Sequence, residues 1–275
     1  MSTIEVEYRS VGDAMPAAAR AALVTLTRPD SLNPIDAPML DELDAALDAI
    51  EARRLDAGDV RAILVTGAGR AFSAGGDLLG YRSLQQDPVG FPRFVSALHR
   101  IFGRLRTGPL PAIALVNGVA VAGGLELILN CDFALAARSA RIGDGHLNFG
   151  QMGGGGVLTL LPRAIGRARA TELMLSGRLL SADEAAEWGL VSRVVDDDDL
   201  LDEGLAVVAG IAAKSPLAVA NAKQVMHRIW ASGDSVDAGL ADECASDVEY
   251  CLTSQDAREG LAAFAEKRTP RFEGR

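Results

Sequence analysis

Two glycine-rich turns within residues 117–150 constrain the fold of this chain more than any other feature. The first turn, residues 118–124, passes directly into the apolar run 125–129, which predicts a helix that begins at the turn. Glu126 is the one acid inside that run. Because the first amides of a helix lack intrahelical partners and glycine lets a ligand approach the backbone, this turn is suited to hold an anion.

The second turn follows a strand-like segment and carries Asp144 and His146. An acid is costly to bury unless it is paired or functional, so Glu126 is a candidate general acid or base. The structural alternative is an ion pair between Glu126 and an arginine such as Arg141 or Arg163. His146 is either a second proton-transfer group or a turn residue without catalytic importance. For Asp144, stabilisation of the turn is the favoured role.

The remaining pattern alternates strands and helices and ends in a helical tail. Alternation of apolar and polar residues predicts a strand at residues 4–9, and mainly apolar segments predict strands at 21–26, 62–66, 112–116, 133–137 and 190–195. The first two are expected to pair antiparallel around Gly12 and Pro16, and residues 67–80 read as a glycine-rich loop. Helical spacing and capping residues predict helices at 37–53, 91–105, 157–165, 167–175, 182–188, 200–213, 216–230, within 236–251, and 255–267. This order predicts an α/β fold with right-handed crossovers and a C-terminal helical region.

Composition limits the class of protein. A chain of 275 residues with 49% hydrophobic content suits one large domain, with or without a helical appendage. A net charge of −10 makes non-specific nucleic-acid binding a poor hypothesis. Three cysteines without a paired spacing favour a reduced, cytoplasmic setting, and scattered His and Cys residues predict no metal site. No segment reads as a signal peptide or a membrane span.

Three segments together resemble the crotonase superfamily, also called the enoyl-CoA hydratase/isomerase family. They are Ala71-Phe72-Ser73-Ala74-Gly75-Gly76-Asp77-Leu78, then Asn117-Gly118-x-Ala-x-Ala-Gly123-Gly124-x-Glu126-Leu127, then Cys131-Asp132. The resemblance continues to the tail Lys267-Arg268-x-Pro270-x-Phe272. It implies a spiral of ββα units over residues 1–199 and a helical trimerisation region over residues 200–275.

The resemblance also implies roles for individual residues. The amides of Gly76 and Gly123 would stabilise an enolate oxygen, where one such donor is worth about 3 kcal/mol in other enzymes; the structural alternative is that these glycines only serve tight turns. Glu126 matches one of the two glutamates of family hydratases. Phe264 and Lys267 match positions that contact the adenine and phosphates of CoA. The other implied substrate-binding residues are Ser73, Ala74, Gly75, Asp77, Leu78 and Gly124, with Asp77 expected to brace its loop and cap a short helix.

Two departures from the family pattern lie near the second turn. Family hydratases carry a second glutamate in a Gly-x-Pro-Glu turn, where this chain has Gly143-Asp144-Gly145-His146. The following Pro-Gly-x-Gly-Gly turn of the family is replaced by four glycines at 153–156. The acyl pocket is therefore predicted to differ from that of a standard short-chain hydratase.

The leading hypothesis is reversible hydration of a 2-enoyl-CoA, with Glu126 and His146 as the proton-transfer pair. No cofactor is expected, because coenzyme A is part of the substrate. Alternatives on the same platform are double-bond isomerisation, decarboxylation and C–C hydrolysis, and a further alternative is a non-catalytic acyl-CoA-binding protein. The family implies a homotrimer or a dimer of trimers, and neither a membrane nor a nucleic acid is an expected partner.

Overall fold

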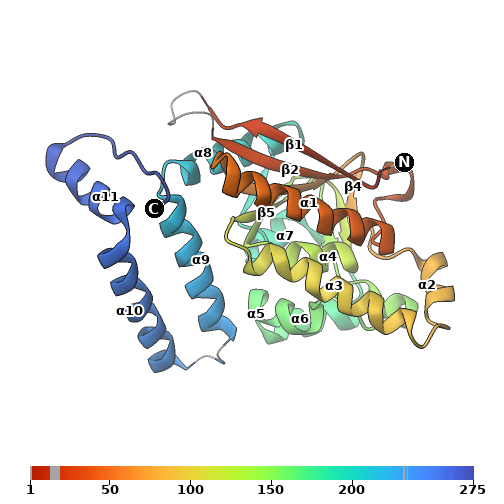
Figure 1. Cartoon of the computed structure of the whole chain (residues 1–275). Coiled ribbons are helices and arrows are strands. Elements are labelled where there is room, and N and C mark those ends of the chain that lie inside the picture. Colours follow the sequence, from red (N-terminus) through yellow and green to blue (C-terminus); the bar gives the residue numbers. More distant parts are fainter. Residues whose placement is uncertain (1, 13–18, 232, 234) are drawn as a thin grey trace.

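The computed structural model describes residues 2–12, 19–231, 233 and 235–275, so the predicted turn residue Pro16 lies outside the described residues. Within these ranges the chain forms two sheets (Figure 1). The six-stranded sheet has the order β1 (Ile4–Ser10), β2 (Arg20–Leu26), β3 (Val60–Gly67), β5 (Ala112–Val116), β7 (Phe133–Ala137) and β10 (Arg193–Val195). The four-stranded sheet has the order β4 (Ala71–Ser73), β6 (Val119–Val121), β8 (Arg141–Gly143) and β9 (Leu180–Ser181).

Helices connect and cover these strands. The described α-helices are α1 (Ala37–Asp56), α2 (Leu78–Leu84), α3 (Gly90–Thr107), α4 (Gly123–Leu129), α5 (Val157–Ile165), α6 (Arg167–Ser176), α7 (Ala182–Glu187), α8 (Leu200–Ala212), α9 (Pro216–Ala231), α10 (Val236–Thr253) and α11 (Gln255–Glu266). Short 3₁₀ helices are η1 (Pro29–Ser31), η2 (His146–Phe149) and η3 (Asp197–Asp199).

Successive passes of the chain each add one strand to each sheet. β3, β5 and β7 pair in parallel in the large sheet, while the strands that follow them, β4, β6 and β8, pair in parallel in the small one. β1 and β2 pair antiparallel, as the sequence predicts. This repetition is the predicted α/β spiral, and it brings the turns after β4, β6 and β8 to one edge of the small sheet.

The central strands of the large sheet are buried on both faces, because their side chains alternate between the two faces and each face packs against a core. In β2, Ala22 and Val24 pack into the larger core with α1 and α3, while Leu23 faces the smaller core. Helix α8 covers that second face through Leu200 and Val208. The two cores explain why β2, β3, β5 and β7 are mainly apolar, whereas the outer strand β1 alternates apolar and polar residues.

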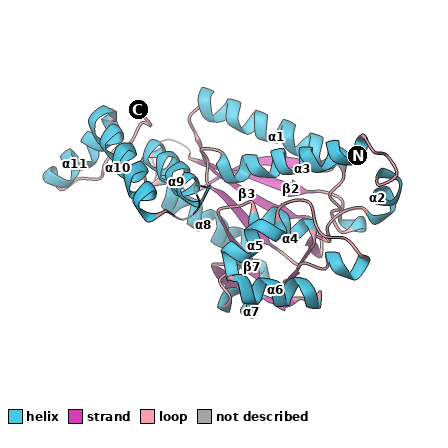
Figure 2. Ribbon diagram, turned by 90° about the horizontal axis from the view of Figure 1, so that it is seen from below, coloured by secondary structure: helices cyan, strands magenta, loops and turns pink. Residues whose placement is uncertain are grey.

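Helices α9, α10 and α11 extend away from the sheets to one end of the molecule, and α2 lies at the opposite end (Figures 1 and 2). The buried Lys223 of α9 anchors this helical region. Its Nζ donates hydrogen bonds to the carbonyls of Leu105 (2.7 Å) and Leu110 (2.6 Å) and pairs with Asp132 at 2.7 Å.

Local sequence signals match most element positions. Asp36 caps α1 by accepting a hydrogen bond from the Met39 amide, and Ser181 and Glu184 form the predicted capping box of α7. The prediction that residues 67–80 form only a loop is wrong, because the stretch contains β4 and the first turn of α2. β4 pairs with β6, which lies far along the chain. A strand of three residues is too short to show a periodic pattern in the sequence.

Candidate active site

The first glycine loop follows β4 and is tied to the segment after η1. Ser73 is fully buried, and its Oγ donates to the Asn33 carbonyl (2.8 Å) and accepts from the Gly75 amide (3.2 Å). The Ala74 amide donates to the Leu32 carbonyl at 2.9 Å. Gly75 has φ 92°, a conformation that favours glycine. These bonds hold the amide that follows, that of Gly76, in a defined position.

Asp77 lies at the end of this loop and caps α2, as the sequence predicts. Its side chain accepts a hydrogen bond from the Leu79 amide at 3.1 Å. Leu78, the first residue of α2, is about half exposed. Asp77 therefore has a structural contact that accounts for its position beside the loop.

The second glycine loop joins β6 to α4 and packs against the first. A Cβ added at Gly124 would lie 2.2 Å from the Ser73 carbonyl oxygen, so only glycine fits there. A Cβ added at Gly123 would lie 3.5 Å from the Gly75 Cα and 3.7 Å from the Gly76 nitrogen. Among the described residues, no hydrogen-bond acceptor contacts the amide of Gly76 or Gly123. Two neighbouring free amides are the arrangement that stabilises an oxyanion.

Glu126, one turn into α4, is 1% exposed. Its Oε1 accepts hydrogen bonds from the backbone amides of Gly155 (2.7 Å) and Val157 (3.3 Å). The alternative of an arginine partner is wrong for the two candidates, because Arg141 and Arg163 donate to backbone carbonyls instead. Burial raises the pKa of Glu126 despite these two amides and the nearby imidazole.

His146 opens η2 and faces Glu126. Its Nε2 lies 3.9 Å from Glu126 Oε2, and its Nδ1 lies 2.7 Å from Asp144 Oδ1. The His146 side chain is 14% exposed. Burial alone would lower the pKa of His146, but the hydrogen bond to Asp144 and the charges of Glu126 and Asp144 raise it above its ordinary value. The structure thus brings Glu126 and His146 together.

The four-glycine turn, residues 153–156, closes over this pair. A Cβ at Gly153 would lie 3.0 Å from His146 Cε1 and 3.1 Å from Glu126 Oε1. A Cβ at Gly155 would lie 2.6 Å from Glu126 Oε2. The amide of Gly155 is a site element that was not predicted from sequence, although the departure from the family pattern at these glycines marked the turn.

Tyr81 of α2 is a further neighbour that sequence reasoning missed. Its ring lies 3.4 Å from where a Cβ on Gly76 would be, and it packs edge-to-face against Phe91 and Phe94 at centroid distances of 5.7 and 5.5 Å. Burial and the charge of Glu126 raise the pKa of Tyr81. No local pattern distinguishes this tyrosine from a core aromatic.

Phe264 and Lys267 are not brought to the glycine loops within one chain. Phe264 is 84% exposed on α11, and Lys267 ends that helix in a left-handed conformation (φ 56°). Figures 1 and 2 place α11 at the end of the molecule opposite α2. The neighbouring Arg268 is paired with Glu259 (2.6 Å) and Glu266 (2.5 Å).

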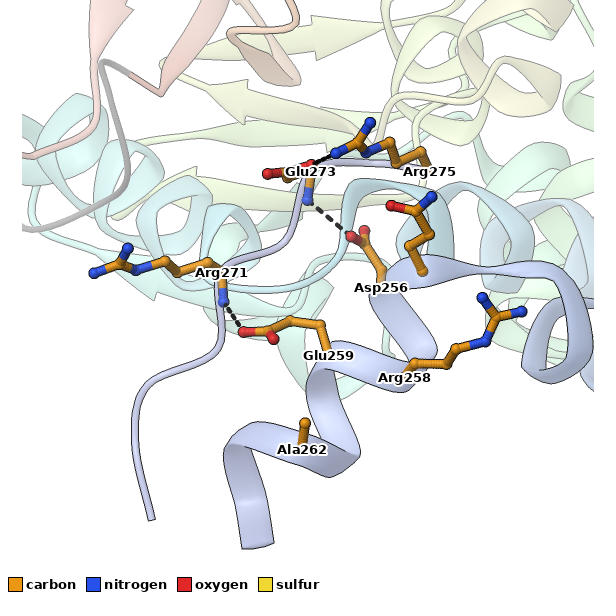
Figure 3. Close-up of a pocket in the computed structure, with 8 residues that line it drawn as sticks. Asp256, Arg258, Glu259, Ala262, Arg271, Glu273 and Arg275 are labelled. Atoms are coloured by element: carbon orange, nitrogen blue, oxygen red, sulfur yellow. Dashed lines mark hydrogen bonds and ion pairs between the residues drawn. The ribbon is translucent and has the colours of Figure 1, made fainter. Parts of the chain in front are cut away.

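A pocket of about 420 Å³ lies between α11 and the last residues of the chain (Figure 3). Both acidic side chains and arginines line the pocket. The backbone amides of Arg271 and Glu273 donate hydrogen bonds to the side chains of Glu259 and Asp256. These bonds hold the final segment onto α11, so the pocket is built from structural contacts. It is separate from the glycine loops.

Two further properties of the described residues concern metal binding and membrane insertion. These residues contain no group of three or more His, Cys, Asp or Glu side chains placed to hold a metal ion. None of their single helices has the length and apolar character of a membrane span, although the bent pair Asp197–Ala212 and Pro216–Ala231 passes that test by length and composition.

Known proteins resemble this chain in sequence and in fold. The family model for enoyl-CoA hydratase/isomerase matches residues 17–275. A probable enoyl-CoA hydratase of Mycobacterium tuberculosis (strain CDC 1551 / Oshkosh) is 36% identical over 253 residues, which cover 92% of this chain and 94% of the relative. The short-chain-enoyl-CoA hydratase of Clostridium acetobutylicum is 32% identical over 250 residues, 90% of this chain and 92% of the relative.

A solved enoyl-CoA hydratase from Bacillus anthracis superposes with a TM-score of 0.88 at 34% identity, covering 99% of this chain and 100% of that one. The chain therefore belongs to the enoyl-CoA hydratase/isomerase family of the crotonase superfamily, which confirms the predicted family and fold.

Proposed function

We propose that this protein catalyses the reversible hydration of a 2-enoyl-CoA thioester. One observation carries the proposal: Glu126 Oε2 and His146 Nε2 lie 3.9 Å apart. One water oxygen can be about 2.8 Å from both groups at that separation. Glu126 lies on the helix that Gly123 opens, and the free amides of Gly123 and the neighbouring Gly76 would hold the thioester oxygen as it gains charge. The family membership and the names of the relatives support the same reaction.

The chemistry balances with one acid and one base. Ionised Glu126 takes a proton from water as the water oxygen bonds to the β-carbon of the enoyl group. Electrons move to the thioester oxygen, where the Gly76 and Gly123 amides stabilise the enolate. Protonated His146 then delivers the Nε2 proton to the α-carbon. Transfer of a proton from Glu126 to His146 restores the starting state, and the net reaction adds one water.

Isomerisation of a double bond is the second candidate, favoured by the same 3.9 Å separation. Two proton-transfer groups so close together suit removal of a proton from one carbon and its return to another carbon of the same acyl chain. The two reactions differ in product, because isomerisation adds no water. Product analysis with a 3-enoyl-CoA distinguishes them.

We also propose a cytoplasmic homotrimer or dimer of trimers that needs no cofactor beyond the CoA of its substrate. Large apolar side chains exposed on α10 and α11 support the oligomer, among them Leu252 (70%), Leu261 (75%) and Phe264 (84%). Association through these helices would also give Phe264 and Lys267 a place near the CoA of some active site. Light scattering tests the oligomer, and a monomer would contradict it.

The loss of enoyl-thioester absorbance with crotonyl-CoA and with a longer 2-enoyl-CoA tests the reaction. The parent is expected to turn over, and His146→Ala is expected to lose about 100-fold or more in kcat, the range for a positioned proton donor. A folded parent that binds CoA thioesters tightly but converts none would overturn hydration and support a binding role.

A further inference from the structure

Among the described residues, the Asp144 carboxylate has one polar contact, and its partner is His146. The Asp144 side chain is 3% exposed, between Gly143 and Gly145, and its Oδ1 lies 2.7 Å from His146 Nδ1. Among the described residues no backbone amide donates to the Asp144 carboxylate. The predicted role of Asp144 in stabilising its turn can therefore act only through the side chain of His146, two residues along. The carboxylate is directed to the histidine instead.

This contact decides which nitrogen of His146 is available. An ionised carboxylate only accepts hydrogen bonds, so His146 Nδ1 carries a proton whenever the bond to Asp144 is made. The other nitrogen, Nε2, faces Glu126 across 3.9 Å. Within the described part of the chain, Asp144 and Glu126 are the charged groups that act on His146, and a Cβ at Gly153 would lie 3.0 Å from His146 Cε1.

We propose that Asp144 is a positioning residue that keeps the proton on His146 Nδ1 and so presents Nε2 as the atom that exchanges protons with the substrate and Glu126. This inference rests on the proposed function, and it deepens the account of the same site. Asp144 itself touches neither the reacting atoms nor the two glycine amides that would hold the oxyanion.

The proton balance gives Asp144 a specific task. When protonated His146 gives its Nε2 proton to the α-carbon, the ring becomes neutral with Nδ1–H still bonded to Asp144. Nε2 is then an acceptor, ready for the proton that Glu126 took from water. Without the Asp144 carboxylate the neutral ring can hold its proton on Nε2 instead, and that form cannot accept a proton from Glu126.

The test combines ring-nitrogen NMR with kinetics on the full-length protein. The chain has three histidines, so His146→Ala assigns the signals of His146. In the parent we expect neutral His146 to be the Nδ1–H form and its pKa to exceed the ordinary value. In Asp144→Asn, which keeps the side-chain shape, we expect a lower His146 pKa and a mixture of neutral forms.

Kinetics should change in the same variant. We expect kcat of Asp144→Asn to fall about 100-fold, the lower part of the range for a positioned proton-transfer group, with KM within about threefold of the parent. The high-pH limb of the kcat/KM profile should move to lower pH. Asp59→Asn is the control, because Asp59 is a mostly buried acid paired with Arg53 and Arg20 outside the site. It should leave the His146 signals and the pH limb unchanged.

The outcomes separate this inference from the proposed reaction. A parent in which neutral His146 carries its proton on Nε2 would overturn the role of Asp144, and this measurement needs no substitution at Asp144. So would an Asp144→Asn protein with the parental His146 pKa and pH profile. If the parent hydrates no 2-enoyl-CoA but the NMR results are as expected, the role of Asp144 stands and the hydration proposal fails.

Discussion

Glu126 Oε1 accepts a hydrogen bond from the backbone amide of Gly155 at 2.7 Å, across 29 residues of sequence. This bond joins helix α4 to the four-glycine turn and orients the carboxylate so that Oε2 faces His146. A buried acid held in this way has lost rotational freedom before any substrate arrives. Such preorganisation is what proton transfer in an active site requires.

Gly155→Ala should damage activity through Glu126. The new Cβ would lie 2.6 Å from Glu126 Oε2, and the buried carboxylate has little space to move. We expect kcat to fall about 100-fold, the effect of a displacement of about 1 Å at a reacting group. Gly154→Ala is the matched control, because its Cβ would meet only Val95 at an ordinary 3.5 Å. Equal activity of the two variants in the enoyl-thioester assay would contradict the role of this contact.

Glu126→Gln should abolish most turnover while leaving the protein folded. Glutamine has the shape of glutamate and can still accept the Gly155 and Val157 amides through its carbonyl oxygen, but it cannot take a proton from water. We expect kcat to fall by about 10³-fold or more and the melting temperature to stay at or above that of the parent, since burial disfavours the charge that is removed. Near-normal activity would exclude Glu126 as the base.

The dependence of kcat/KM on pH should be bell-shaped. Glu126 must be ionised, and its pKa is raised above the ordinary 4.5, so activity should fall on acidification at a pH above 4.5. His146 must be protonated, and its pKa is raised above the ordinary 6.5, so activity should also fall as pH rises, with a midpoint above 6.5. Initial rates between pH 4 and 10, with stability checked at each pH, measure both limbs. If the high-pH limb persists unchanged in His146→Ala, that limb does not report the deprotonation of His146.

Lys223→Met should destabilise the attachment of α9 to the sheets. The substitution removes the ion-pair partner of Asp132, which keeps its hydrogen bond from the Ala112 amide, and removes the donor to the Leu105 and Leu110 carbonyls. Lys223 is buried but Asp132 is exposed, so the main cost is the loss of the charged hydrogen bonds to the two carbonyls, each worth about 1.5–3 kcal/mol. The free energy of unfolding in urea measures the loss. Lys214→Met is the control, because Lys214 is exposed. An equal loss of unfolding free energy in both variants would show that the buried contacts of Lys223 are unimportant.

Much of the fold could be predicted because its signals are local. The Asp36 cap and the Ser181–Glu184 capping box lie within three or four residues of the amides they satisfy, so sequence reading located both helix starts. The apolar runs of β3 and β5 identified strands for the same reason. The short strand β4 was missed, because its pairing with β6 depends on a segment almost fifty residues away.

The sequence by itself determined the family, the order of the longer strands and helices, and the presence of an acid and a histidine at two glycine turns. Only the tertiary structure decided what those groups contact. Glu126 meets the Gly155 amide rather than an arginine, and the Asp144 carboxylate meets the His146 side chain rather than a backbone amide of its turn. For Glu126 the physical reason is distance along the chain. Capping and periodicity act over one or two turns, whereas the orientation of a buried carboxylate depends on which remote backbone folds against it.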